Sequence, residues 1–275
     1  MKQKTSAANI VLTIISVFLA IVFLFPIVWM MLISFKPQST LFNSLSSSFV
    51  PPFTLANFKQ LLWQSSEMLW MGNSVIIAVV STVLTLLVTS MAAFALSKIV
   101  FTGRKTVYFI YMAGLMIPTE AMVIPLYIIS RHMGILDSNE GIILPSIALP
   151  LAIIILKNFF DSIPKDLLES ANIDGCGWLR CYWSIVMPLS KTALSALGIF
   201  VFVQNWNNFL WPFLSLTTEK KFTLPVGIPV FNSSYSVNYV LPMTANTLAS
   251  IPIIIVYFIF EKQIVKGITM SGIKG

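Results

Sequence analysis

Six long apolar blocks, separated by short polar segments, constrain this chain more than any other feature of its sequence. A helix of about 20 apolar residues crosses the hydrocarbon core of a bilayer, and the blocks are of this length or longer. Only 10% of the 275 residues are charged, whereas soluble domains carry roughly a quarter. A water-soluble fold could not bury so much apolar surface.

The length of the blocks also selects the type of membrane fold. Backbone groups in lipid must be satisfied within the spanning segment, and barrel strands are much shorter than these blocks. The sequence therefore predicts an all-α polytopic membrane protein of one domain, 1–275, in the cell membrane. Its six transmembrane helices are expected at 7–35, 70–97, 107–130, 141–160, 191–213 and 240–260.

A cleavable signal peptide is the alternative interpretation of the first block. Its apolar stretch exceeds the roughly 7–15 residues of a signal-peptide core, and no small-residue cleavage site follows it. We therefore expect 7–35 to be a retained first span. The outer segment after it, 36–69, is predicted to be irregular, with one short helix around 57–64.

The distribution of Lys and Arg predicts that both termini are cytoplasmic, because loops rich in these residues stay inside. Five lie on the predicted outer side: Lys36, Lys59, Arg131, Lys220 and Lys221. Twelve lie on the predicted inner side: Lys2, Lys4, Lys98, Arg104, Lys105, Lys157, Lys165, Arg180, Lys191, Lys262, Lys266 and Lys274. The same sorting accounts for the net charge of +7, and without a long basic run it gives no reason to expect nucleic-acid binding.

The two cysteines and the single histidine do not form a metal-binding pattern. Cys176 and Cys181 are both predicted to lie in an inner loop, where a reducing cytoplasm disfavours a disulfide. Their spacing matches no usual pair of metal ligands, and His132 is expected on the opposite side. No metal site is expected.

The inner loop 161–188 is the longest polar stretch on the predicted cytoplasmic side. Pro164 suits the first position of a helix, and Gly175 tolerates the left-handed conformation that ends one. We expect a helix over 164–174, a turn at Gly175 and a second short helix over 178–186.

Within this loop, residues 169–175 read Glu-Ser-Ala-Asn-Ile-Asp-Gly, and residues 185–189 read Ile-Val-Met-Pro-Leu. This resembles the Glu-Ala-Ala loop of ABC importer permeases, with Ser170 and Met187 as mild departures from the pattern. The resemblance implies a cytoplasmic coupling helix between the fourth and fifth spans that docks on an ATPase. The implied coupling residues are Glu169, Ser170, Ala171, Asp174, Gly175 and Pro188. A solvated connector is the alternative reading of the loop alone.

Three further stretches resemble the carbohydrate-uptake branch, which includes the maltose-type, binding-protein-dependent permeases. They are Phe-Pro-Ile-Val-Trp-Met at 25–30 with Ser-Phe-Lys-Pro at 34–37, Trp-Asn-Asn-Phe-Leu-Trp-Pro at 206–212, and the tail at 265–275. The tail resembles those that reach the ATPase interface, which implies a contact there for Lys266, Gly267 and Ser271.

The resemblance implies a division of labour among several chains. No Gly-x-x-x-x-Gly-Lys-Ser/Thr loop is present, so we expect no ATPase activity and no cofactor in this chain. ATP and Mg would be bound by two cytoplasmic ATPase subunits. A second related permease subunit, an extracellular solute-binding protein and a sugar complete the implied assembly, which lies in membrane lipid.

Two sets of polar residues are candidates for the substrate path. Glu120, between Pro118 and Pro125, would cost at least about 2.5–3.5 kcal/mol if unpaired inside a bilayer. It either faces water and binds a sugar hydroxyl or a partner helix, or it stabilises a proline-broken helix. The second set can stack on and hydrogen bond to a sugar, although interfacial anchoring is the simpler reading: Asn205, Trp206, Asn207 and Asn208.

Three other functions compete with the importer reading. A secondary transporter needs internal repeats or several intramembrane ionisable groups, and only Glu120 is expected at depth. A membrane-embedded enzyme needs paired carboxylates, a metal cluster or an activated nucleophile, none of which the spans contain. An ABC permease for a non-sugar solute differs only in the family branch.

Overall fold

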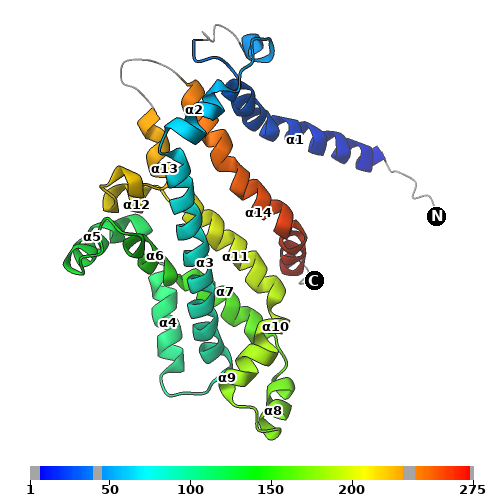
Figure 1. Cartoon of the computed structure of the whole chain (residues 1–275). Coiled ribbons are helices and arrows are strands. Elements are labelled where there is room, and N and C mark those ends of the chain that lie inside the picture. Colours follow the sequence, from blue (N-terminus) through cyan, green and yellow to red (C-terminus); the bar gives the residue numbers. More distant parts are fainter. Residues whose placement is uncertain (1–6, 40–44, 232–238, 273–275) are drawn as a thin grey trace. The chain divides into compact units, whose positions relative to one another are not determined.

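The computed structural model describes residues 7–39, 45–231 and 239–272, and every regular element within these ranges is helical (Figure 1). In the last helix, side chains are described as far as Glu261. The chain divides into two compact units. Unit 1 consists of Met1–Met68 with Gly227–Ile251, and unit 2 of Leu69–Val226 with Pro252–Gly275.

Three helices in the described part are long and apolar enough to cross a membrane. They are α1 (Ala7–Ser34), α3 (Glu67–Lys98) and α14 (Val240–Gly272). Their apolar stretches cover the positions expected for the first, second and sixth spans. The count reaches six if each of three bent helix pairs is one span.

The span predicted over 107–130 is divided by a sharp break. The structure has α4 (Arg104–Gly114), then the 3-10 turn η2 (Thr119–Met122) and α5 (Val123–His132), with a bend of 97° between the two halves. Pro118 is extended, with φ −59° and ψ 135°. Proline lacks an N–H group and keeps the preceding residue out of the helical region, so the first half ends before it.

The expected helix over 141–160 is also divided, into α6 (Asn139–Ile147) and α7 (Pro150–Asp161), with a bend of 42°. Leu149, directly before Pro150, has φ −101° and ψ 100°. Here too the residue before proline leaves the helical region, which is the conformation that proline imposes on its predecessor.

The fifth apolar block begins at Lys191, as expected, but it is not one helix as far as position 213. Helix α11 (Lys191–Trp206) ends earlier, and a separate short helix, α12 (Leu210–Ser215), follows it. Asn207 and Asn208 lie in the gap, where side-chain amides compete with the helical hydrogen bonds. Before α11, the helical run Trp178–Leu189 meets it at a bend of 80°.

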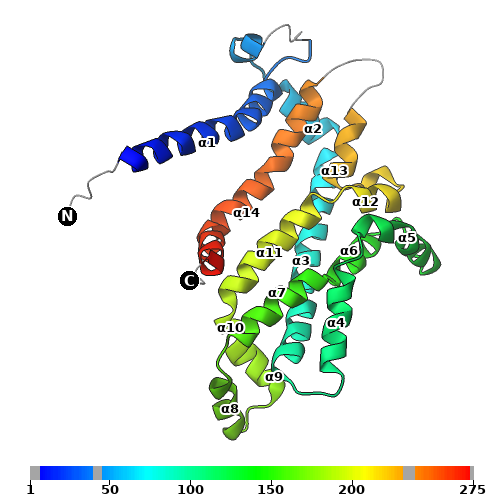
Figure 2. The same cartoon turned by 180° about the vertical axis from the view of Figure 1, so that it is seen from behind.

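Unit 2 is built around a buried core shared by α3, α7, α11 and the segment between α7 and α11. Phe94 of α3, Leu156 and Phe160 of α7, and Val201 of α11 are at most 5% exposed. Figure 2 shows these helices from behind, with α8 and α9 at one end of unit 2 and α12 with α13 (Leu224–Gly227) at the other.

Unit 1 joins the end of α1 to the start of α14 through buried polar contacts. It also contains η1 (Leu45–Phe49), α2 (Ala56–Gln64) and η5 (Ile228–Phe231). The Asn57 amide donates to the carbonyl oxygens of Ser34 (2.9 Å) and Lys36 (2.7 Å). The hydroxyls of Ser34 and Thr247 lie 3.2 Å apart. Helix α2 is the short helix expected around 57–64.

Candidate functional site

The loop that carries the sequence motif forms a helix on the surface of unit 2. Helix α8 (Lys165–Ile173) begins one residue later than expected, because Pro164 is its extended N-cap residue with ψ 134°. Leu168 is 5% exposed and joins the core, whereas its neighbour Leu167 is 44% exposed. The helix is therefore anchored on one face and open on the other.

Backbone hydrogen bonds close the end of α8. Gly175 has φ 78°, and its N–H donates to the carbonyl of Asn172 at 3.0 Å. The N–H of Cys176 donates to the carbonyl of Ala171 at 2.9 Å. These two bonds form a Schellman motif, which needs a left-handed residue at its centre. The left-handed turn expected at Gly175 is confirmed.

After this turn the chain forms one helical run instead of the single short helix expected over 178–186. Helix α9 (Trp178–Cys181) passes into a π-helical turn, η3 (Tyr182–Val186), and then into α10 (Met187–Leu189). Tyr182 in the π turn is 2% exposed. Its hydroxyl lies 2.7 Å from that of Ser90, and its ring centroid lies 5.4 Å from that of Phe94. Both partners belong to α3, so the turn is fixed to a spanning helix.

Polar contacts join the chain before α8 to the same end of α3. Asp161, the last residue of α7, accepts a hydrogen bond from Ser97 at 2.7 Å and pairs with Lys157 at 2.5 Å. The ammonium group of Lys98 donates to the carbonyl of Ile163 at 2.8 Å. Helix α8 is therefore held on both sides by contacts to the spanning helices.

Several large apolar side chains on α8, α9 and η3 are exposed. The largest exposed fractions belong to Ile173 at 86% and Leu179 at 63%, and Trp183 is 50% exposed. Large apolar side chains left open on a well-packed base are typical of a protein contact. We define the exposed apolar set as Leu167, Ile173, Trp178, Leu179 and Trp183.

The motif residues predicted to act in coupling all lie in this region. Ala171 is half-buried against the core, and Gly175 forms the turn. The others are exposed, and the Ser170 hydroxyl donates to the carbonyl of Leu167 at 3.2 Å. The exposed members are Glu169, Ser170, Asp174 and Pro188.

At the other end of unit 2, the amide and aromatic residues around position 206 are divided by the end of α11. Trp206 is 3% exposed and stacks on Phe202 with ring centroids 5.8 Å apart, so its ring is not open to a ligand here. The Asn205 amide donates to the carbonyl of Val201 at 2.9 Å. Asn207 is exposed and Asn208 is half-buried.

Glu120 is not in the middle of a helix, as its position in the expected third span implied. It is exposed in η2, directly after the 97° break. A carboxylate beside a helix break reaches water or a partner chain more easily than one inside a continuous span.

A carboxylate that the sequence reasoning missed organises the end of unit 2 near α12. Asp137 accepts hydrogen bonds from the backbone N–H groups of Thr217 (2.9 Å) and Thr218 (3.0 Å) and from the Thr218 hydroxyl (2.7 Å). Lys221, in η4 (Glu219–Lys221), pairs with it at 3.0 Å. Burial alone raises the pKa of Asp137, but these bonds outweigh it and hold the pKa well below its usual range.

The remaining expected sites lie partly outside what the structure describes. Lys266, Gly267 and Ser271 fall within α14, beyond the last side chain that is described. Among the described residues, no group of three or more His, Cys, Asp or Glu is placed to hold a metal ion.

Comparison with known families identifies the family of this chain. Residues 85–270, more than half of the chain, match the family described as "Binding-protein-dependent transport system inner membrane component". The chain belongs to this family. With its apolar helices, this makes it a multi-pass protein of the cell membrane.

Curated relatives match over most or much of this permease. The arabinooligosaccharides transport system permease protein AraQ of Bacillus subtilis is 34% identical over 98% of this chain and 97% of its own length. The sn-glycerol-3-phosphate transport system permease protein UgpE of Yersinia pestis is 34% identical over 62% of each chain. The diacetylchitobiose uptake system permease protein NgcG of Streptomyces coelicolor is 31% identical over 64% of this chain and 60% of its own length.

One solved structure has the same fold. It is a chain of a bacterial ABC transporter involved in the import of the acidic polysaccharide alginate. The two chains superpose with a TM-score of 0.83 over 95% of this permease and 98% of the other chain, at 23% sequence identity.

Proposed function

We propose that this permease is one of two related membrane-spanning subunits of an ATP-driven sugar importer. Each bent helix pair would count as one span, giving six spans with both termini in the cytoplasm. The excess of Lys and Arg on the side of α8 supports this orientation, because such loops remain inside. Two cytoplasmic ATPase subunits, an external solute-binding protein and a second permease subunit would complete the complex.

The anchored but open surface of α8 and α9 carries the proposal. The exposed apolar set would enter a groove on an ATPase subunit, and the exposed carboxylate of Glu169 would pair with a basic group there. Leu168 and Tyr182 attach the same segment to the spanning core. A movement of the ATPase would therefore be passed to α3, α7 and α11 as a rigid displacement, because close-packed cores transmit strain.

A sugar is the proposed solute because AraQ and NgcG are permeases for an arabinooligosaccharide and a diacetylchitobiose system. AraQ is matched over nearly its whole length. UgpE serves an sn-glycerol-3-phosphate system, which makes a small phosphate ester the second candidate. Because the sequence contains no Gly-x-x-x-x-Gly-Lys-Ser/Thr loop, the proposal assigns ATP binding and hydrolysis to the ATPase partners.

For the solute path we propose Glu120, Asn207 and Asn208. Asn205 is left out of this set because its side-chain amide is bonded to its own helix. Amide and carboxylate groups at helix breaks can form hydrogen bonds to sugar hydroxyls. Trp206 contributes to this path only if the α11 end rearranges, because its ring is buried against Phe202.

Two glycines of the loop allow a sharp test of coupling. A Cβ added at Gly175 or at Gly177 would meet open space, but only Gly175 has a positive φ, at 78°. The change Gly175→Val therefore strains the turn by about 1–2 kcal/mol or more. Gly177 has φ −70° and ψ 160°, which valine adopts readily, so Gly177→Val is the matched control.

Uptake of radiolabelled arabinooligosaccharide should be measured in vesicles that contain the whole complex, together with ATP hydrolysis and recovery of the chain in the membrane. We expect Gly175→Val to insert normally but to transport less sugar per ATP, and Gly177→Val to behave as wild type. Uptake by this chain without ATP, driven by an ion gradient, would instead establish a secondary transporter. Equal coupling in both variants would mean that α8 is only a connector.

A further inference from the structure

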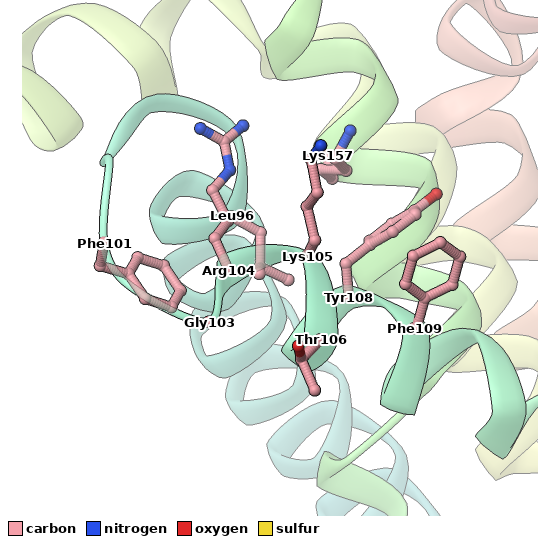
Figure 3. Close-up of a pocket in the computed structure, with 9 residues that line it drawn as sticks. All are labelled: Leu96, Phe101, Gly103, Arg104, Lys105, Thr106, Tyr108, Phe109 and Lys157. Atoms are coloured by element: carbon pink, nitrogen blue, oxygen red, sulfur yellow. The ribbon is translucent and has the colours of Figure 1, made fainter.

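An open pocket of about 910 Å³ lies at the turn between α3 and α4. None of the residues that line it has a role in the proposed function. Figure 3 shows its lining, which comes from the end of α3, the turn around Gly103, the first turns of α4 and Lys157 of α7. The nitrogen ends of Arg104, Lys105 and Lys157 point to the same side of this view.

The charged residues that line the pocket are all cationic. Arg104 donates to the backbone carbonyls of Ser97 (2.9 Å) and Ile99 (3.4 Å), which fixes its position but leaves its charge uncompensated. Lys157 pairs with Asp161 and lies 4.8 Å from the ring centroid of Tyr108. Lys105 is exposed and has no hydrogen-bond or ion-pair partner among the described residues. Three cations and one nearby acid leave an excess of positive charge.

Apolar surface continues from the cationic pocket along α4. Phe109 lines the pocket and is 67% exposed, and its neighbour Ile110 is 66% exposed. An anionic group bound by Lys105 would therefore have an apolar surface beside it. This pairing of a charged head and an apolar wall is the chemistry of a phospholipid, and basic pockets between membrane helices on the cytoplasmic side bind anionic headgroups.

We propose that this pocket binds the phosphate headgroup of an anionic phospholipid of the cytoplasmic leaflet, with acyl chains along the exposed face of α4. Arg104, whose guanidinium already donates to two backbone carbonyls, supplies a fixed positive charge beside the phosphate, and Lys105 adds a mobile ammonium group that can donate hydrogen bonds to it. The assignment to the cytoplasmic leaflet depends on the orientation given under the proposed function, whereas the binding of the lipid to the pocket does not. A bound lipid would tie the α3–α4 turn to Lys157 of α7, close to the contacts that hold α8.

The test is a titration of the purified complex with dioleoylphosphatidylglycerol, followed by native mass spectrometry. The variant is Lys105→Gln, because this side chain supports no described contact. The matched control is Lys191→Gln, which removes an exposed charge at the start of α11, outside the pocket. Dioleoylphosphatidylcholine and inorganic phosphate serve as the zwitterionic and the free-anion probes.

We expect Lys105→Gln to weaken phosphatidylglycerol binding about fivefold, the effect of one basic residue near an anionic headgroup. Lys191→Gln should bind like wild type, phosphatidylcholine should not distinguish the three proteins, and excess phosphate should not displace the lipid. Equal binding by Lys105→Gln and wild type would overturn the proposal. So would displacement by phosphate, which would make the pocket a site for a free anion. Neither of these two results would contradict the importer proposal, because the experiment measures lipid binding and not transport.

Discussion

The hydroxyl groups of Ser90 and Tyr182 lie 2.7 Å apart in the buried core, and this contact joins α3 to the π-helical turn after α9. Ser90 also bonds to the carbonyl of Leu87 at 3.0 Å, so it keeps a partner if the tyrosine hydroxyl is removed. The pair therefore links the segment after α9 to the spanning helix α3. It is not the only contact that either element makes.

Removing this hydroxyl with Tyr182→Phe should lower the free energy of unfolding by about 0.5–1.5 kcal/mol, the usual worth of one internal hydrogen bond. Thermal unfolding of the purified complex would measure it. Tyr257→Phe on α14 is the control, because that side chain is 51% exposed. Additive losses in Tyr182→Phe and Ser90→Ala would contradict an energetic link between the two residues.

Two neighbouring leucines on α8 should separate anchoring from docking. Leu168→Ala empties a site in the core and should cost about 2–5 kcal/mol locally, raising amide hydrogen exchange over 165–173. Leu167→Ala removes an exposed side chain and should leave exchange unchanged while lowering co-purification of the ATPase subunits. The same exchange pattern in both variants would show that the two faces are not distinct.

Asp137 should make the stability of the protein depend on pH in the acid range. Its folded-state pKa is lowered, so its contribution is complete above the ordinary aspartate pKa of about 3.9 and is lost as pH falls below that value. We expect Asp137→Asn to be less stable than wild type by about 1–2 kcal/mol at pH 7.

Melting temperatures of wild type and Asp137→Asn from pH 7 down to pH 3 would check this, with the exposed Glu140→Gln as control. The two curves should approach each other below about pH 4. A gap that stays constant down to pH 3 would mean that the carboxylate charge is not what stabilises the contact with Lys221.

Gly141 and Gly72 should respond in opposite directions to the same change. A Cβ at Gly141 would lie 2.1 Å from the carbonyl oxygen of Ile135, so Gly141→Ala must move the backbone, at a cost of about 1–3 kcal/mol. A Cβ at Gly72 in α3 meets nothing within 4 Å, so Gly72→Ala should stabilise the helix by up to about 1 kcal/mol. Chemical unfolding of both variants tests the pair, and equal shifts would refute the steric account.

Local chemistry made much of the surface helix predictable. Pro164 and Gly175 marked its two ends, and the structure places α8 between them, with Gly175 in the left-handed conformation. Helix α2 was likewise visible as a short polar stretch in a loop. These elements depend on residues close together in the sequence, which is what local patterns describe.

The helix breaks and the Asp137 contacts depend on different information. Pro118 and Pro150 were visible in the sequence, but proline is tolerated inside membrane helices, so the sequence pattern alone did not predict a 97° bend. Thr218 follows Asp137 by 81 positions, and no local pattern reports such a pairing. The burial of Trp206 against Phe202 depends in the same way on how α11 packs.

The turn at Gly175 has a consequence for how such a subunit changes its ATPase partner during evolution. Its shape is set by two backbone hydrogen bonds and one residue without a Cβ. The exposed apolar set takes no part in those bonds. Trp178 and Trp183 pack against Phe94 and Tyr182, which leaves Leu167, Ile173 and Leu179 as the members that can differ without altering the fold. If these positions contact an ATPase as proposed, substitutions there can change the partner-facing surface while the backbone turn beneath them keeps its shape.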